Sequence, residues 1–438
     1  MVKVLIYVNI ALALILILYS IKRESLNVAL PTLAWLGFMV LPYLFSYRFF
    51  PESTRLDQIL GISFINIAIL LGDFLSIANQ KRLMELEVPR VYKFKCFKIL
   101  ILIIIFFPIL HYTISGNIPL LDYLFKNFTN TEDSLNRTNF TKTSIPYVMG
   151  ITSNLYVVIL IPITLIFLIH MRKLVLSLLV LSWGAFYAVS SGAKGPLVML
   201  LVSMAFAYSF SKNKKVLEKL SFVVLAAIFT SVLSGYIYGN YMLSNSTKCV
   251  VPVGVKVTPA NISRSCLADE KLSINPIVNT LGYRVFLTPI EVSNHWYEYY
   301  KVTDRNIFDV LTRRESPKAS NLVGIKYYFD KFPNSYTKYI NANSSIDADA
   351  FSIFGLIGVA IVSLFLFGLR VYIGNHRPHS PPITKSFEGI ALSLLVTLPF
   401  TASFQAILLA QGMIALILMI FYFRNQDYLH SKIRLKSK

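Results

Sequence analysis

Residues 4–21 read VLIYVNIALALILILYSI, and the basic pair Lys22 and Arg23 follows directly. About 20 consecutive apolar residues are enough for a helix to cross the hydrocarbon core of a bilayer. Similar apolar runs, separated by short polar and charged breaks, recur near 27–45, 57–78, 97–113, 147–170, 174–190, 196–210, 219–241, 349–373, 387–403 and 405–423. This pattern predicts an all-α polytopic membrane protein with about 11 transmembrane helices.

The composition agrees with a membrane protein. Charged residues make up 15% of the chain and hydrophobic residues 55%, whereas soluble domains carry about 25% charged residues. The formal net charge is +20. On a soluble protein such an excess would suggest nucleic acid, but much of it lies in short loops between spans, where it sets membrane orientation. No nucleic-acid partner is therefore expected.

Lysine and arginine are distributed unequally between alternate loops. One set of loops, with the C-terminal tail, holds 22 of them, and the opposite short segments hold seven. Because positive charge stays in the cytoplasm, the N-terminus is expected outside and the C-terminus inside. Eight spans are predicted within 1–241, with an outer loop at 114–146. A large and partly helical outer loop follows at 242–348, then three spans within 349–423 and a basic cytoplasmic tail at 424–438.

Lys194 lies in a glycine-containing turn between two predicted spans, Ser190-Ser-Gly-Ala-Lys-Gly-Pro196. Glycine lets a backbone approach a bulky anionic group closely. The lysine would stand at the start of the next helix, whose dipole also favours anions. The turn is therefore a candidate anion site. The alternative is a lysine whose ammonium reaches the lipid headgroups.

A second candidate centre lies within residues 281–300 of the large loop. If this segment is helical, Arg284, Thr288, Glu291 and His295 fall on one face, although Pro289 could kink it. The planar guanidinium of arginine suits phosphate, and His295 beside Glu291 suits a general base with an orienting carboxylate. The alternative is an amphipathic helix on the membrane surface with a solvated polar face.

Acidic residues mark two further positions. Asp347 and Asp349 stand at the outer start of the ninth predicted span. A helix N-terminus is stabilised by negative charge, so one role of these carboxylates is to cap the helix. The alternative role is binding of sugar hydroxyls or general-base catalysis. Asp73 lies inside the third predicted span. It is a functional candidate because ionisable residues are rare in spans, and pairing with Lys81 is the alternative.

Cys249 and Cys266 both lie in the large outer loop. An oxidising compartment allows two such cysteines to form a disulfide, and this pairing is predicted. His376 and His379 are close in the sequence but have no cysteine or acidic residue beside them. A metal site needs more ligands than this, so neither a metal nor another cofactor is expected.

Four short stretches occur in the order and topology of a known family. They are Ser115-Gly-Asn-Ile-Pro-Leu-Leu121, the turn Ser190-Ser-Gly-Ala-Lys-Gly-Pro-Leu197, Arg284-Val-Phe followed by Pro289 and a tyrosine-rich run, and Asn343 through Phe354-Gly-Leu-Ile-Gly358. Together they resemble the Wzy-type oligosaccharide repeat-unit polymerases, the O-antigen and capsule polymerases of bacteria. The turn departs from the family in one respect, since Lys194 stands where arginine is usual.

The resemblance implies a GT-C-like glycosyltransferase of the bacterial inner membrane. Such enzymes join undecaprenyl-pyrophosphate-linked repeat units on the periplasmic face, so the implied partners are the lipid-linked donor and acceptor glycans and membrane lipid. A chain-length-determining membrane protein is a further partner that the resemblance leaves open. The implied pyrophosphate-binding residues are Arg284, Lys194 and Arg137. The implied acceptor-side catalytic residues, unranked, are His295, Glu291, Asp347 and Asp349.

Two other functions fit parts of the sequence. An O-antigen ligase, which transfers finished glycan to a lipid A core, would share the topology and the basic outer loop. A flippase for lipid-linked oligosaccharide would be expected to show inverted repeats and charged residues at mid-membrane. Of such mid-membrane charges the sequence offers only Asp73, and it shows no internal repeat. Both observations favour the polymerase over the flippase.

Overall fold

The structure, a computed structural model, describes residues 1–23, 26–80, 97–121, 146–190, 195–211, 288–302, 345–374, 382–400, 408 and 411–436. Within these ranges all regular secondary structure is helical and there is no strand. Four helical segments are long and apolar enough to cross a membrane: Val2–Lys22, Glu52–Ala78, Ile151–Ile169 and Ile346–Gly374. The prediction of an all-α membrane protein is confirmed at this level.

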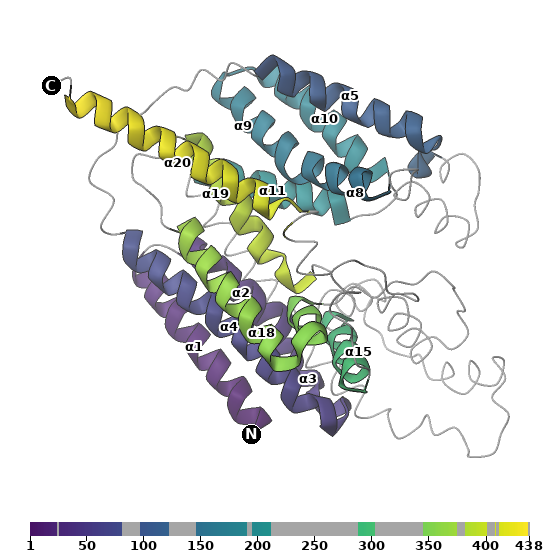
Figure 1. Ribbon diagram of the computed structural model, residues 1–438, viewed down its shortest axis with the longest axis vertical. Coiled ribbons are helices and arrows are strands. Elements are labelled where there is room, and N and C mark those ends of the chain that lie inside the picture. Colours follow the sequence, from purple (N-terminus) through teal and green to yellow (C-terminus); the bar gives the residue numbers. More distant parts are fainter. Residues whose placement is uncertain are drawn as a thin grey trace, which may run out of the picture. The chain divides into compact units, whose positions relative to one another are not determined.

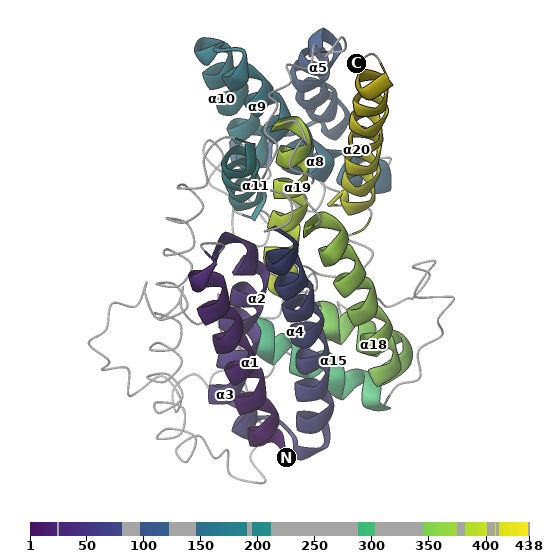
Figure 2. The ribbon, with the colours of Figure 1, turned by 90° about the vertical axis from the view of Figure 1, so that its left-hand side faces the viewer.

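The chain divides into two compact units, and each is described by itself. The first unit comprises residues 1–72, 222–368 and 397–404, and the second comprises 73–221, 369–396 and 405–438. Helices of the first unit are α1 (Val2–Lys22), η1 (Leu26–Ala29), α2 (Leu30–Trp35), η2 (Leu36–Val40), α3 (Leu41–Ser46), η3 (Tyr47–Phe49), α15 (Thr288–Val302), η7 (Leu398–Phe400) and most of α4 (Glu52–Gln80) and α18 (Ile346–Gly374). Within it, α1, α4 and α18 run side by side in both views (Figures 1 and 2).

Among the described residues, the second unit holds the last turns of α4 and α18 and eight further helices. These are α5 (Phe97–Ser115), α8 (Pro146–Leu155), η5 (Tyr156–Leu160), α9 (Ile161–His170), α10 (Leu174–Ser190), α11 (Gly195–Ser211), α19 (Pro382–Val396) and α20 (Met413–Lys436). One apolar core joins several of them through buried Ile104, Tyr156, Leu165, Val180 and Leu200. The predicted spans at 97–113, 174–190 and 196–210 therefore correspond to α5, α10 and α11. The predicted span at 219–241 lies outside the described residues.

Two predicted spans contain a short π-helical segment directly before a proline. The segment η2 precedes Leu41-Pro42, and η5 precedes Ile161-Pro162. A proline inside a helix removes one donor, and its ring clashes with the carbonyl four residues earlier. A wider π turn relieves such a clash while the chain stays helical. The predicted spans 27–45 and 147–170 are therefore helical throughout, but not uniformly α-helical.

The helix α18, which covers the span predicted at 349–373, is broken near its start, and the sequence analysis did not anticipate this kink. Phe354 and Gly355 have non-helical backbone angles, with φ 60° and ψ −143° at Gly355. Only glycine adopts such a conformation without strain. A side chain at Gly358 would lie 2.3 Å from the carbonyl oxygen of Ala350, so both glycines of Phe354-Gly-Leu-Ile-Gly358 are needed. The helix α18 therefore consists of two helical segments that meet at Phe354 and Gly355.

At the C-terminal end, α19 ends at Val396 and α20 begins at Met413, where the predicted spans ran over 387–403 and 405–423. Residues 401–407, 409 and 410 lie outside the described part of the chain. The residues predicted as a basic tail are helical as far as Lys436. Hydropathy found the apolar centre of α20, but its polar second half has no apolar pattern that marks it as helix.

Two arginines that the sequence analysis counted as loop charges are buried in ion pairs of the second unit. Arg370 Nε bonds Asp73 Oδ1, and Arg424 Nη2 lies 2.5 Å from Glu388 Oε1. Arg424 Nη1 also donates to the Tyr372 carbonyl oxygen at 2.9 Å, near the end of α18. Without these two arginines the predicted inner loops still hold 20 basic residues against seven, so the charge asymmetry persists.

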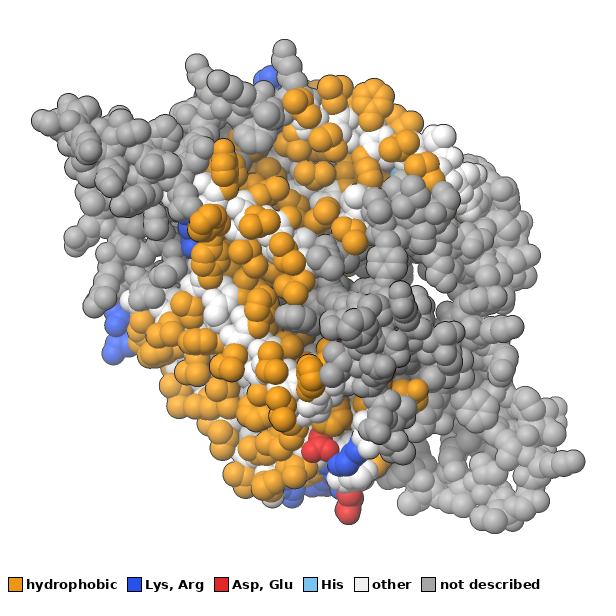
Figure 3. Space-filling view, viewed as in Figure 1, with side chains coloured by type: hydrophobic (Ala, Val, Ile, Leu, Met, Phe, Trp, Pro, Cys, Tyr) orange, Lys and Arg blue, Asp and Glu red, His pale blue; other side chains and the backbone are white. Residues whose placement is uncertain are grey.

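The outer surface of the described helices is apolar. Leu18 on α1, Val175 on α10 and Leu364 on α18 are 67, 75 and 71% exposed. Figure 3 shows hydrophobic side chains over most of the described part of one face. So many exposed apolar side chains are unfavourable in water and suit contact with lipid. The exposed faces therefore agree with a membrane protein.

Asp73→Ala is expected to lower the free energy of unfolding by about 3–5 kcal/mol, because a buried guanidinium would lose the carboxylate that bonds it. Thermal unfolding in detergent micelles measures the loss. The control is Asp73→Leu combined with Arg370→Met, which removes both charges and should recover most of the stability. Equal stability of the single variant and the wild type would contradict this account of the pair.

Candidate functional site

The candidate site lies in the first unit, where the first turns of α4, the loop helix α15 and the start of α18 meet. In α15 the residues Ile290, Asn294, Tyr297 and Lys301 follow helical spacing on one face, and each contacts α4. Pro289 is the second residue of α15. Proline is favoured in the first turn of a helix, so it starts the helix rather than kinking it.

Amide side chains join α15 to α4 in the buried part of this contact. Asn294 Nδ2 donates to Thr54 Oγ1 at 3.0 Å and to Gln58 Oε1 at 2.9 Å. Gln58 Nε2 donates to the Ile290 carbonyl oxygen at 3.1 Å. Hydrogen bonds of this kind are strong where water is excluded. They fix the position of α15 along α4.

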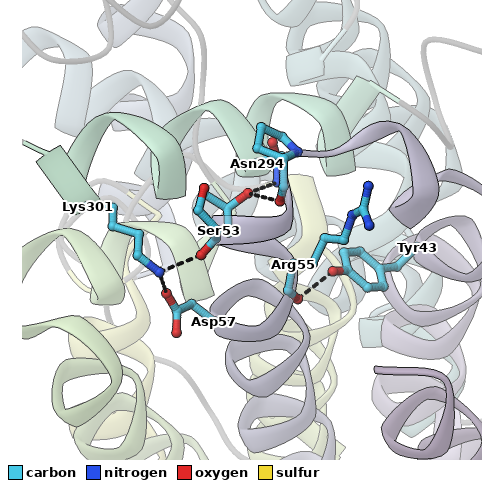
Figure 4. A network of polar contacts seen from close by, with 8 residues as sticks. Tyr43, Ser53, Arg55, Asp57, Asn294 and Lys301 are labelled. Carbon is cyan, nitrogen blue, oxygen red and sulfur yellow. Dashed lines mark hydrogen bonds and ion pairs between the residues drawn. The ribbon is translucent and has the colours of Figure 1, made fainter. Parts of the chain in front are cut away.

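Charged side chains border this contact where it is more exposed. Lys301 Nζ bonds Asp57 Oδ2 at 2.6 Å and also the carbonyl oxygen of Ser53 (Figure 4). The Tyr43 hydroxyl donates to the Arg55 carbonyl oxygen at 2.6 Å. Arg55 Nε in turn donates to the Phe50 carbonyl oxygen at 2.7 Å, which fixes the turn between α3 and α4.

Asp347 is the most deeply buried carboxylate of the site. It lies in the first turn of α18, and its Oδ2 accepts a hydrogen bond from the Tyr297 hydroxyl at 3.2 Å. Both side chains are fully buried. The Ser345 hydroxyl and the backbone N–H groups of Asp347 and Ala348 also act on this carboxylate as hydrogen-bond donors, as is usual at the start of a helix. Burial, with a smaller effect of the Asp347 carboxylate, raises the pKa of the Tyr297 hydroxyl well above its usual value. Tyr297 therefore remains a donor at physiological pH.

Asp349 lies in the same first turn of α18. Its backbone N–H donates to the Ser345 carbonyl oxygen at 3.0 Å, and its carbonyl oxygen accepts from Ser352 Oγ at 2.5 Å. The predicted place of both aspartates at the start of a helix is thus observed, and a helix N-terminus favours negative charge. Asp347 is held by the side chain of Tyr297 on α15.

His295 and Glu291 also lie on α15. His295 Nδ1 is 3.5 Å from Glu298 Oε2, one turn further along the helix. Sequence reasoning missed Glu298, although its spacing of three residues from His295 places the two side chains on neighbouring positions of a helix. Glu291 lies in the first turn of α15. Its proposed role in orienting His295 is untested and stays a prediction.

The predicted cationic residues Arg284, Lys194 and Arg137, and the predicted disulfide between Cys249 and Cys266, lie outside the described residues. Arg284 precedes α15 by four residues in the sequence. Across the ranges that the structure covers, no three His, Cys, Asp or Glu side chains are grouped as metal ligands.

Comparisons with protein-family models, with curated proteins and with solved structures found no match to this chain. Its function is therefore inferred from the residues of the site and their arrangement. The site contains a buried carboxylate bonded to α15, a network of amides between α15 and α4, and on the same helix α15 an imidazole beside Glu298. Such groups can bind hydroxyls and remove a proton from one.

Asn294→Leu is expected to lower the free energy of unfolding by about 1–3 kcal/mol, because Gln58 Oε1 would be left buried without its donor. The comparison variant on the same helix is Lys301→Met, which removes a partly exposed ion pair and should cost about 0–1 kcal/mol. Thermal unfolding in detergent ranks the two. A larger loss in Lys301→Met would contradict this description of the contact.

Proposed function

We propose that this protein is a glycosyltransferase of the bacterial inner membrane that polymerises undecaprenyl-pyrophosphate-linked oligosaccharide repeat units into O-antigen or capsular polysaccharide. The observation that carries the proposal is the Asp347 carboxylate, buried at the start of an apolar helix and bonded to the loop helix α15. A carboxylate held at this position is suited to accept a proton from a sugar hydroxyl.

The proposed topology has about 11 spans, a periplasmic N-terminus and a cytoplasmic C-terminus, on the positive-inside rule, with a GT-C-like arrangement. Residues 242–348 would then be periplasmic, as would the starts of α4 and α18. The hydrogen bonds of α15 to Thr54, Gln58 and Asp347 support this, because they join a segment of that loop to these two helix starts. A helix of the loop and two helix ends predicted on the same side are thus in contact.

In the proposed reaction, the growing glycan leaves its lipid pyrophosphate and is transferred to a hydroxyl at the non-reducing end of the incoming unit. The bond between the anomeric carbon and the pyrophosphate oxygen breaks, and that oxygen keeps the electron pair. The acceptor oxygen forms the new bond and gives its proton to a carboxylate or imidazole of the site. Arg284, Lys194 and Arg137 would stabilise the leaving pyrophosphate, since such contacts are strong where water is excluded.

A transporter of lipid-linked oligosaccharide is the second candidate function. The buried pairs Asp73–Arg370 and Glu388–Arg424 favour it, because ionisable residues within spans often line a transport pathway. Each of these charges is bonded to an opposite charge, however, which is what a structural role requires. The polymerase accounts for the buried carboxylate of the outer site as well, so it is preferred.

Arg284→Ala is expected to lower polymer formation by about 100-fold, as loss of a group that stabilises transition-state charge does. Arg284→Lys should retain part of the activity, because lysine keeps the charge but not the planar fork. The measurement is a lipopolysaccharide gel of a deletion strain that carries each variant, with immunoblots to confirm equal protein.

The alanine variant should leave only single-unit-capped lipopolysaccharide. A normal ladder in that variant would contradict the role of Arg284. Loss of all surface glycan in the deletion strain would instead indicate a ligase or a flippase.

A further inference from the structure

At the end of the first unit that is predicted to lie outside, two basic side chains have no acidic partner among the described residues. We propose that these two residues, Arg48 and Lys3, bind the diphosphate of the acceptor, which is the lipid-linked unit that supplies the sugar hydroxyl. This inference rests on the proposed function, in which two lipid diphosphates are held at the same membrane surface. Arg284, Lys194 and Arg137 are proposed only for the diphosphate that leaves.

The charge balance at this end of the unit leaves the two proposed residues uncompensated. Arg55 lies beside Glu52, with Nη1 3.6 Å from Oε1. Lys301 Nζ bonds Asp57 Oδ2 at 2.6 Å. No ion pair within the described ranges involves either of the two proposed residues. Basic residues outside the membrane oppose the positive-inside rule, so an anionic ligand is a reason to keep them there.

The turn η3 holds Arg48 in a fixed position at the surface. Its carbonyl oxygen accepts a hydrogen bond from Arg55 Nη2 at 2.8 Å. Its guanidinium lies 5.9 Å from the centre of the Tyr47 ring, and its Nε donates to the Tyr47 hydroxyl at 3.4 Å. The Arg48 side chain is exposed, and neither of its Nη atoms has a hydrogen-bond partner among the residues described. These two groups are therefore available to bond the oxygens of a phosphate.

Lys3 lies at the same end of the unit. The starts of α1 and α4 are together there in both views (Figures 1 and 2), and η3 directly precedes α4. The hydrogen bond to Tyr47 raises the pKa of the Arg48 guanidinium, and Tyr7 of α1 adds a smaller effect, so Tyr7 is near Arg48. Lys3 precedes Tyr7 by four residues, which places both side chains on one face of α1. The long, flexible lysine side chain can therefore reach an anion bound at Arg48.

The surroundings of the two cations suit a lipid rather than a soluble phosphate. Tyr7, Leu14 and Leu18 on α1 are each more than half exposed, and their spacing places them along one face of the helix. This apolar strip begins beside Arg48 and follows the predicted span, so a lipid chain would lie along it. A diphosphate that links a lipid to a sugar carries two negative charges, which matches two cations. The phosphate of a phospholipid carries only one.

Binding to the full-length protein in detergent tests the inference without catalysis. The probe is undecaprenyl diphosphate, and native mass spectrometry counts the molecules bound and gives their dissociation constants. The variants are Arg48→Gln, Lys3→Gln and the double variant. The matched control is Arg23→Gln at the opposite end of α1, because Arg23 is also exposed and lies 5.5 Å from the centre of a tyrosine ring, that of Tyr19.

The wild type is expected to bind two molecules of the probe. Each single variant should weaken one of these two sites by about tenfold and the double variant by about 100-fold, because charge-assisted hydrogen bonds to phosphate are lost. In polymer formation from purified lipid-linked units, the double variant should raise KM by a similar factor and leave kcat within about twofold of the wild type. Arg23→Gln should match the wild type in both measurements, and phosphatidylglycerol should bind all of these proteins equally.

Unchanged binding of the probe by the double variant would overturn the inference. An equal loss in Arg23→Gln would also overturn it, because any exposed arginine would then serve. Weaker binding of phosphatidylglycerol by the double variant would assign the two residues to phospholipid and so overturn the acceptor site. A protein that binds the probe through Arg48 but forms no polymer would retain the diphosphate site and contradict the proposed function instead.

Discussion

A polar side chain inside an apolar helical unit has no water to bond, so it needs a partner within the protein. This constraint accounts for several of the contacts between helices of the structure. In the first unit, Asn9 on α1 donates to Ser63 on α4 at 2.7 Å and accepts from Asn66 at 2.9 Å. In the second unit, Arg370 bonds Asp73 and so ties the last turn of α18 to α4. Apolar surface faces outward, and the polar pairs determine which helices meet.

The same constraint applies to Asp347, which is held by neutral donors. Its Oδ2 accepts a hydrogen bond from Tyr297, and the Ser345 hydroxyl and the backbone N–H groups of Asp347 and Ala348 also act on the carboxylate as donors. Elsewhere the fold satisfies buried carboxylates such as Asp73 and Glu388 with arginine. The carboxylate held by neutral donors beside a loop helix is the one that the proposed reaction uses as a base.

The spans were predictable because hydropathy is a local property of the sequence. Runs such as 97–113 and 174–190 correspond to helices within a few residues. The break at Gly355 was not predictable in this way, since it depends on a backbone conformation and on the approach of the Ala350 carbonyl. Arg370 and Arg424 were mistaken for loop charges, because a buried, paired arginine and an exposed one look the same in a sequence.

The site was predictable only in part. The aspartates at 347 and 349 precede an apolar run, and this local signal placed them correctly at a helix start. The contact between Tyr297 and Asp347 was not predicted, because it joins segments far apart in the chain and leaves no periodic trace. Glu298 was missed for a weaker reason. Its spacing from His295 was visible, but Glu291 on the other side of the histidine gave an equally good pattern.

The proposed chemistry requires the starts of α4 and α18 to face the periplasm. The most direct measurement is labelling of single cysteines by a membrane-impermeant maleimide, in a chain whose three native cysteines are replaced by serine. Cysteine at the exposed position of Glu52, which begins α4, should react in cells with an intact inner membrane. Cysteine at Arg23, just after α1, should react only after that membrane is disrupted. The opposite result would place the site on the cytoplasmic side and contradict the account.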